Sequence, residues 1–301
     1  MNIPYNFLGL PEKYSKYRSA KVVILPVPYD GTVSYVKGTA KGPEAIIRAS
    51  PQLEYYDEVL GIEQFKLGIH TLPPMKKRNS PQAVVDAVYK EVKRQMQKGK
   101  FTVVFGGEHS ITTGEIRAYS EAYKDLSILQ FDAHADLRDE YNGNKHSHAC
   151  AMRRAFEFCP SIVQIGIRNI SKEEVDFVAE KKHTGIFYAH NMRYDKSWRS
   201  KALAKLKRNV FITIDLDAFD SSIMPATGTP EPGGLDWYDV TTMLGAVAKS
   251  RNIVGFDIVE LAPKEGFHSC DFLAAKLAYR LIGMRFHSER LSLFANDKQI
   301  I

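Results

Sequence analysis

The segment "QFDAHADLRDE" at residues 130–140 joins the end of an apolar run, "DLSILQF", to two aspartates and a histidine. Asp132, His134 and Asp136 are spaced two apart and alternate with alanines. Side chains at positions i, i+2 and i+4 of an extended chain point to the same side. The segment therefore predicts two carboxylates and an imidazole on one side of the end of a buried strand, where the charges need a partner of opposite sign.

Short apolar runs alternate with amphipathic patterns along the rest of the chain. The predicted strands are 21–27, 65–70, 101–107, 126–132, 161–167, 185–190, 209–217 and 252–260. The predicted helices are 81–100, 110–123, 148–157, 171–182, 236–249 and 268–283. Near-continuous apolar strands are typical of a parallel sheet that is covered on both faces. Since no Gly/Ser/Pro-rich linker interrupts this alternation, we expect one α/β domain over residues 1–301.

The composition argues against several other classes of protein. The 301 residues carry a net charge of +6, but the basic residues are scattered among acids and form no nucleic-acid-binding motif. No apolar run approaches the ~18 residues of a membrane span, and the N-terminus has no signal-peptide pattern, so we expect a cytoplasmic protein without membrane contact. Cys150, Cys159 and Cys270 form no C-x-x-C pair, which indicates reduced, mainly structural thiols.

Three further predicted strands end in chemically active residues. The strand at 101–107 is followed by "GGEHS", which contains His109, and the strand at 209–217 ends in Asp215 and Asp217. The strand at 252–260 ends in "DIVE", with Glu260 last. Ligands of open α/β sheets bind outside the carboxyl ends of the strands. We therefore expect these side chains to share one edge of the sheet with "DAHAD".

The charges of this set predict a site for two metal ions. Four carboxylates supply about four negative charges, which two divalent ions would balance and one ion would not. A set rich in carboxylate with few imidazoles suits a hard ion such as Mn²⁺ better than Zn²⁺. The predicted ligands are the two imidazoles and the four carboxylates of His109, Asp132, His134, Asp136, Asp215 and Asp217.

Four segments, "GGEHS", "FDAHADLR", "ITIDLDAFDSSIMPATGTPEPGGL" and "GFDIVELAP", resemble the signatures of the ureohydrolase family, which includes arginases and agmatinases. The similarity extends over nearly the whole chain. It implies a three-layer α/β/α fold with a mostly parallel central sheet, two Mn²⁺ ions per chain, and hydrolysis of a guanidinium group by a hydroxide that bridges the ions. It also implies a homo-oligomer, either a trimer or a hexamer.

The resemblance assigns roles to single residues. Asp132 and Asp215 would bridge the two ions, and Glu260 would bind the guanidinium group side-on. His148 matches the histidine that protonates the departing amine, with His146 as its rival. One departure is Glu108, since many relatives have Asp before the ligand histidine, and we expect it to alter only the surroundings of the metal ligands.

The loop "DLRDEYNGNKHSHA" and the closing "FLAAKLAYRLIGM" resemble bacterial agmatinases. The expected substrate is therefore agmatine, a small cationic guanidine that would give urea and putrescine. Arginine, free guanidine and guanidinobutyrate remain alternatives, the last because Arg138 could pair with a substrate carboxylate. Two other classes stay open: an amidine hydrolase that uses Cys150 and His148, and a non-catalytic metal-binding protein.

Overall fold

The computed structural model describes residues 3–294, so residues 1–2 and 295–301 of the expected domain lie outside the described part of the chain. Its centre is one sheet of eight strands in the order β2-β1-β3-β8-β7-β4-β5-β6. Every neighbouring pair is parallel. The strands are β1 (Val22–Val27), β2 (Ile69–Thr71), β3 (Phe101–Gly106), β4 (Leu126–Phe131), β5 (Ile162–Ile167), β6 (Ile186–Tyr188), β7 (Asn209–Asp215) and β8 (Asn252–Val259).

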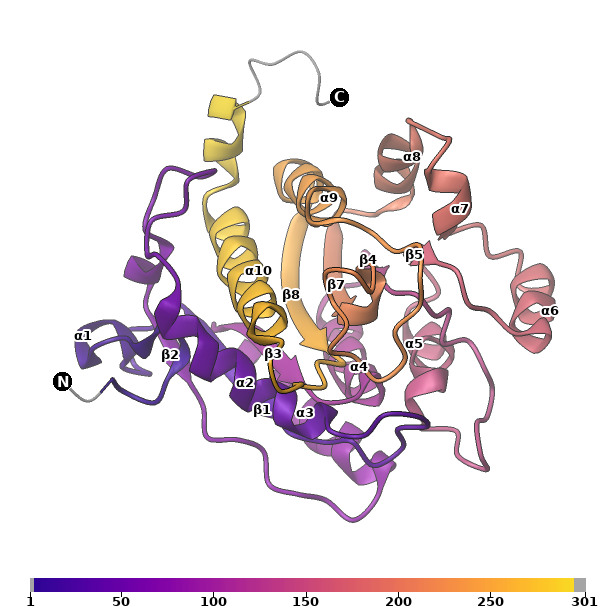
Figure 1. Ribbon diagram of the computed structural model, residues 1–301, viewed down its shortest axis with the longest axis horizontal. Coiled ribbons are helices and arrows are strands. Elements are labelled where there is room, and N and C mark those ends of the chain that lie inside the picture. Colours follow the sequence, from indigo (N-terminus) through magenta and orange to yellow (C-terminus); the bar gives the residue numbers. More distant parts are fainter. Residues whose placement is uncertain (1–2, 295–301) are drawn as a thin grey trace.

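Two layers of helices cover the sheet and complete the predicted α/β/α architecture (Figure 1). One face packs against α2 (Gly42–Ala49), α7 (Ala189–Met192), α8 (Trp198–Lys205), α9 (Trp237–Ser250) and α10 (His268–Phe286). The other face packs against α3 (Pro81–Gln97), α4 (Thr112–Ala122), α5 (Ala151–Phe158) and α6 (Lys172–Glu180). A short helix, α1 (Glu12–Ser15), lies beside β2.

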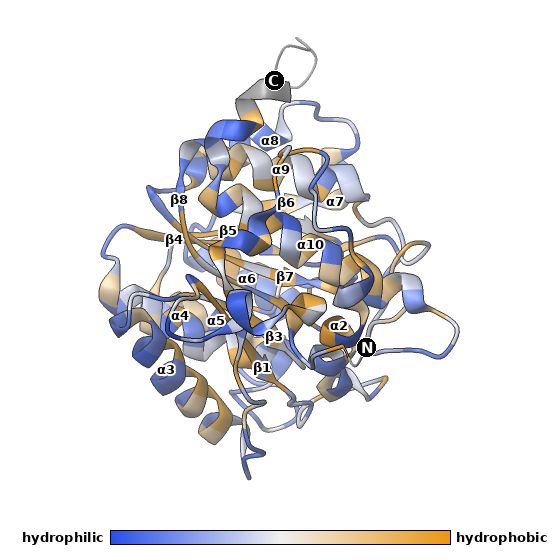
Figure 2. Cartoon of the chain, turned by 90° about the vertical axis from the view of Figure 1, so that its left-hand side faces the viewer, coloured by the Kyte–Doolittle hydropathy of each residue, from blue (hydrophilic) through white to orange (hydrophobic). Residues whose placement is uncertain are grey.

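Alternation of side chains along the strands divides the core between these layers. In β3, Val103 and Phe105 belong to the core under α9 and α10, whereas Val104 belongs to the core under α3 and α4. Helix α3 buries Val84, Val88 and their neighbours at helical spacing and leaves a polar outer face, as the hydropathy colouring shows (Figure 2). Among the described residues, no helix is both long and apolar enough to cross a membrane.

The structure differs from the sequence-based expectation mainly at the edges of the sheet. The predicted strand 65–70 begins as the 3₁₀ helix Gln64–Leu67, and the strand itself starts after Gly68. Gly68 has φ +76°, and a Cβ atom there would lie 2.9 Å from Cα of Ala20, so this turn requires glycine. The predicted strand 185–190 ends at Tyr188, where α7 begins, and the helices α1, α2, α7 and α8 were not predicted.

Candidate metal centre

Four neighbouring strands, β3, β8, β7 and β4, bring their carboxyl ends to the centre of one sheet edge. His109 follows β3, Glu260 follows β8, Asp215 and Asp217 close β7, and "DAHAD" follows β4. The strands β3 and β4 are consecutive in the chain, yet β8 and β7 lie between them in the sheet. Such a point, where the strand order reverses, is the usual ligand site of an open α/β sheet.

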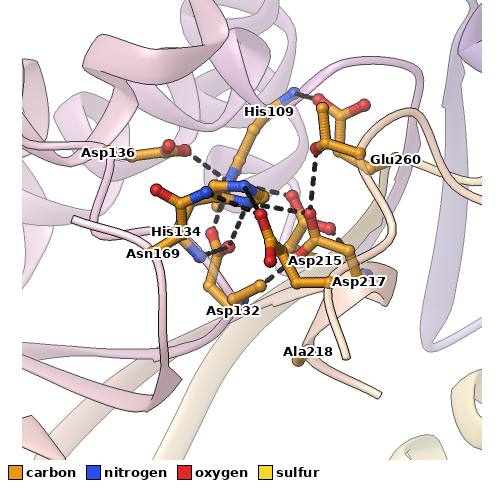
Figure 3. Close-up of polar contacts among 12 residues, drawn as sticks. His109, Asp132, His134, Asp136, Asn169, Asp215, Asp217, Ala218 and Glu260 are labelled. Atoms are coloured by element: carbon orange, nitrogen blue, oxygen red, sulfur yellow. Dashed lines mark hydrogen bonds and ion pairs between the residues drawn. The ribbon is translucent and has the colours of Figure 1, made fainter. Parts of the chain in front are cut away.

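The predicted residues meet there as two overlapping clusters of possible ligand atoms (Figure 3). In the first cluster, Nδ1 of His109 lies 3.1 Å from Oδ2 of Asp132, 3.0 Å from Oδ2 of Asp136 and 3.5 Å from Oδ2 of Asp215. All four side chains are buried. On the far side of the ring, Nε2 of His109 lies 2.9 Å from Oγ1 of Thr213, which leaves Nδ1 to face the carboxylates.

The second cluster is built around His134. Its Nδ1 lies 2.9 Å from Oδ2 of Asp217 and 3.7 Å from Oδ1 of Asp132. Backbone amides fix these carboxylates: the N–H of His134 donates to Oδ1 of Asp132 at 2.6 Å, and the N–H of Ala133 donates to Oδ1 of Asp217 at 3.0 Å. Asp132 therefore belongs to both clusters, as a ligand shared by two ions would.

The extended geometry assumed for "DAHAD" ends earlier than expected. Strand β4 stops at Phe131, and Asp136 has φ +54°, in the left-handed region that non-glycine residues rarely adopt. This turn directs Oδ2 of Asp136 back toward His109, where it meets Asp132. Asp132 and Asp136 thus converge as predicted, but through a strained turn rather than a continued strand.

The donor atoms fit divalent ions. Nδ1 of His109 is buried and has no hydrogen-bond partner among the described residues, although three carboxylate oxygens lie 3.0–3.5 Å away. Two ligands held at right angles about 2.1 Å from one ion would be roughly 3 Å apart, which is the spacing seen. The ligand atoms of His109, Asp132 and Asp136 lie within 4.8 Å of one another, as do those of Asp132, His134 and Asp217. The oxygen-rich set matches a hard ion better than Zn²⁺.

Electrostatics also indicate that this site needs cations. Burial, followed by the charge of Asp132, raises the pKa of Asp136 to about 7. Burial and the charges of Asp217 and Asp132 raise the pKa of Asp215 well above its usual value. Burial opposes a charge on His134, but the carboxylates of Asp217 and Asp132 outweigh it and raise the His134 pKa to about 12. Without metal the carboxylates compete for protons, a competition that divalent ions would relieve.

Glu260 lies beside the metal cluster on a strained backbone, with φ +65°. Its Oε1 accepts a hydrogen bond from the N–H of His109 at 2.7 Å. Its Oε2 faces Gly228 in the loop after β7, where even a Cβ atom would lie 3.8 Å away. One carboxylate oxygen and the remaining lone pair of the other are therefore free to receive a ligand with two parallel N–H groups.

The two candidate histidines of the loop after β4, His148 and His146, have different neighbours. Burial, followed by the positive charges of His134 and His109, lowers the pKa of His148 to about 4, so His148 lies within electrostatic range of two predicted ligands. His146 instead interacts with Arg154 of α5 and with Asp86 of α3. Of the two, His148 is the one whose pKa is shifted by the charges of predicted ligands.

Arg138 and Cys150 are the residues on which two of the alternative functions depend, and the structure bears on the second of these alternatives. The guanidinium group of Arg138 lies 5.3 Å from the ring centroid of Tyr141. Cys150 is buried, and burial followed by the charge of Asp136 raises its pKa to about 12. A thiol that stays protonated is a poor nucleophile, which argues against the Cys150/His148 amidine hydrolase.

Several residues around the centre were not singled out from the sequence. Oδ2 of Asp132 accepts a hydrogen bond from Gln130 at 2.5 Å, and Nε2 of His134 lies 3.9 Å from Oε1 of Glu231. Asn169, in turn, donates to Oε1 of Glu231 at 2.6 Å. Gln130 precedes Asp132 by two positions, so the same strand alternation could have identified it. Glu231 and Asn169 come from distant loops and carry no local signal.

Comparison with known proteins gives consistent results. The model of the arginase family matches residues 20–283. The N(1)-aminopropylagmatine ureohydrolase of Synechocystis is 40% identical over 307 residues, covering 97% of this chain and 100% of that protein. The agmatinase of Pyrococcus horikoshii is 34% identical, covering 89% of this chain and 93% of that protein. The structure of the agmatine ureohydrolase of Thermoplasma volcanium has a TM-score of 0.87 and 33% identity, covering 96% of this chain and 97% of that one.

Proposed function

The chain belongs to the arginase family, and from this membership we propose that it hydrolyses the guanidinium group of agmatine or an agmatine derivative to urea and a polyamine. One observation carries the proposal: the carboxylates of Asp132, Asp136, Asp215 and Asp217, with the imidazoles of His109 and His134, converge where four strands end. Glu260, suited to a guanidinium group, lies directly beside them.

These six side chains would hold two Mn²⁺ ions. When bound, two divalent ions would supply Lewis-acid chemistry and lower the pKa of a water molecule enough for it to attack near neutral pH. The chain itself fixes the ligands in advance, through the backbone amides on Asp132 and Asp217 and through Thr213 behind His109. The preference for manganese rests on the predominance of carboxylate oxygens.

Glu260 would orient the substrate. A planar guanidinium group could donate one N–H to Oε2 and another to the free lone pair of Oε1, a side-on arrangement that fixes its plane. Because Oε1 is already held by the N–H of His109, this arrangement would fix the guanidinium carbon relative to the metal ligands. Gly228 keeps the space beside Oε2 open.

His148 would move the proton that the reaction requires. Burial, followed by the positive charges of His134 and His109, lowers the pKa of His148 to about 4. The imidazole is therefore neutral near pH 7 and can accept a proton. It would take this proton from the attacking water and pass it to the departing amine nitrogen as the C–N bond breaks. The atoms balance as urea plus a protonated amine.

The identity of the substrate tail is the finer part of the proposal. Agmatine was the expectation from sequence, and the relative at 34% identity is an agmatinase. The relative at 40% identity is named for N(1)-aminopropylagmatine, which carries an extra aminopropyl group on the tail. We place N(1)-aminopropylagmatine first on this difference in identity, with agmatine as the second candidate. Both substrates present the same guanidinium group to Glu260.

A urea-release assay tests the proposal. The Mn²⁺-loaded protein would be assayed with N(1)-aminopropylagmatine, agmatine, arginine, guanidinobutyrate, guanidinopropionate and free guanidine. We expect the two agmatine-type compounds to give the highest kcat/KM, and their ratio to identify the tail. Arginine or guanidinobutyrate exceeding both by tenfold or more, about 1.4 kcal/mol in transition-state binding, would overturn the assignment.

We also propose that the protein is a cytoplasmic homo-oligomer, a trimer or a hexamer, in line with the resemblance of its sequence to the ureohydrolases. Light scattering coupled to size-exclusion chromatography would give the number of subunits directly. A monomer at micromolar concentration would contradict this part of the proposal without affecting the chemistry assigned to the metal centre.

A further inference from the structure

The loop after β1 reaches the metal edge of the sheet and is held there by close backbone contacts. The N–H of Gly107 donates to the carbonyl of Val27 at 2.9 Å, and the N–H of Glu108 donates to the carbonyl of Tyr29 at 2.8 Å. A Cβ atom at Gly107 would lie 1.9 Å from that Tyr29 oxygen, so only glycine permits this approach. The contact brings Thr32 of this loop to Glu108, the residue before the predicted ligand His109.

Thr32 and Glu108 are joined by two hydrogen bonds. The N–H of Thr32 donates to Oε2 of Glu108 at 2.6 Å, and its hydroxyl donates to Oε1 at 2.6 Å. The hydroxyl of Ser110 also donates to Oε1, at 2.5 Å. Burial raises the pKa of Glu108, and these three donors oppose that effect by stabilising the carboxylate form. An aspartate at this position would be one methylene shorter and could not reach Thr32 in the same way.

The same hydroxyl group contacts His148. The backbone N–H of His148 donates to Oγ1 of Thr32 at 3.0 Å, and Nδ1 of His148 lies 3.3 Å from that oxygen. A hydroxyl has one proton, and with Glu108 ionised that of Thr32 is donated to Oε1. In this arrangement Oγ1 has only lone pairs left for the imidazole, so the proton of neutral His148 lies on Nδ1.

We propose that Glu108 and Thr32 are positioning residues for His148, which hold its imidazole in the Nδ1–H tautomer and leave the lone pair of Nε2 free to accept a proton. This inference rests on the proposed function for the proton-transfer role of His148. The carboxylate of Glu108 contacts the hydroxyl of Thr32, and that hydroxyl contacts Nδ1 of His148. The proton is therefore held on Nδ1, and the reactive lone pair is on Nε2.

Ser147 is the competing partner of His148. Its hydroxyl lies 3.4 Å from Nδ1, and it could donate to that atom if Nδ1 carried the lone pair. The contact of Thr32 with Nδ1 is shorter, and Glu108 fixes the direction of the Thr32 hydroxyl proton. The hydroxyl of Ser147, by contrast, can rotate to accept a hydrogen bond from Nδ1–H. Ser147→Ala is accordingly the matched control for the Thr32 variants.

Two measurements test the inference. Long-range ¹H–¹⁵N NMR of the protein loaded with diamagnetic Zn²⁺ reports which nitrogen of His148 carries the proton, without any substitution. We expect Nδ1–H in the unmodified protein and in Ser147→Ala. A spectrum with the His148 proton on Nε2 would overturn the proposal, even if no guanidine proves to be a substrate.

The second measurement is kinetic. Thr32→Val keeps the shape but removes the hydroxyl, and we expect kcat to fall about 10- to 100-fold, with KM and Mn²⁺ content unchanged. Thr32→Ser should restore most of kcat, and Ser147→Ala should retain it. If urea is released but Thr32→Val keeps full kcat, the positioning role is wrong while the proposed function stands. If no guanidine yields urea, the proposed function fails, and the NMR result still decides the tautomer.

Discussion

Nδ1 of His134 lies 2.9 Å from Oδ2 of Asp217, across the boundary between β4 and β7. If both atoms bind one ion, Asp217→Asn should remove a charge that neutralises it. We expect metal content to fall from about two ions toward one per chain, with a loss of kcat greater than the roughly 100-fold typical of a lost outer partner. Elemental analysis and a urea-release assay on the same preparation provide the measurement.

Asp176→Asn is the matched control for Asp217→Asn, because Asp176 is an exposed aspartate of α6 that pairs with Lys172 on the surface. It should leave metal content and kcat unchanged. If Asp217→Asn still bound two ions per chain, Asp217 would not be a metal ligand. The contact between Asp217 and His134 would then need another explanation.

Most of this centre could be predicted from local patterns. The i, i+2 spacing of "DAHAD" and "DLD", together with the rule that ligands lie at carboxyl ends of strands, identified all the residues of the two clusters. The core strands were predicted well because each is a continuous apolar run. The left-handed turn at Asp136 was not predicted, since nothing in its sequence separates a strained turn from a continued strand.

What could not be predicted depends on contacts between distant segments. Thr32 and Glu108 are 76 positions apart, and their pairing follows from the adjacency of β1 and β3. Thr213 precedes Asp215 by two positions in β7, so alternation could have placed it behind His109, but threonine is too common in strands to be noticed. The short helices α1 and α7 have only four residues each, which is too few for a periodic pattern.

A histidine substitution separates metal binding from proton transfer. His148→Asn should keep both ions and still bind substrate through Glu260, because the imidazole is in neither ligand cluster. Loss of the proton-transfer group should lower kcat by roughly 10²–10⁴-fold. Metal content and kcat measured together would test the assignment, with His146→Asn as the control that retains activity. Loss of manganese in His148→Asn would make His148 a ligand instead.

Inactivation experiments distinguish the metal mechanism from a thiol mechanism. The three cysteines are buried, and burial raises the pKa of each thiol, that of Cys150 to about 12. Iodoacetamide reacts with thiolates, so it should leave activity unchanged near neutral pH. EDTA should abolish activity, and added Mn²⁺ should restore it. Inactivation by iodoacetamide with full resistance to EDTA would reverse the assignment.

A pair of buried acids behind the metal centre should affect stability as pH changes. Neither carboxylate oxygen of Glu115, nor Oδ1 of Asp257, has a hydrogen-bond partner among the described residues. Burial, followed by the charge of Asp257, raises the pKa of Glu115 well above its usual value. Glu115 therefore stays protonated to a higher pH in the native state than in the unfolded chain, and the protonated acid can donate to Asp257.

The raised pKa fixes the sign of the pH dependence. Stability from the protonated Glu115 is complete below the pKa of the unfolded chain, about 4.3, and is lost as pH rises through the higher native pKa. Glu115→Gln cannot ionise, and its amide can donate to Oδ1 of Asp257 in place of the acid proton. The difference in Tm, variant minus unmodified protein, should therefore increase as the pH rises above about 4.3, the pKa of Glu115 in the unfolded chain. Glu121→Gln, an exposed substitution on the same helix α4, should show no such increase, because the contacts of Glu121 with Lys93 and Tyr89 lower its pKa and keep it ionised throughout this range. A constant Tm difference for Glu115→Gln would mean that Glu115 ionises in the native protein as readily as in the unfolded chain.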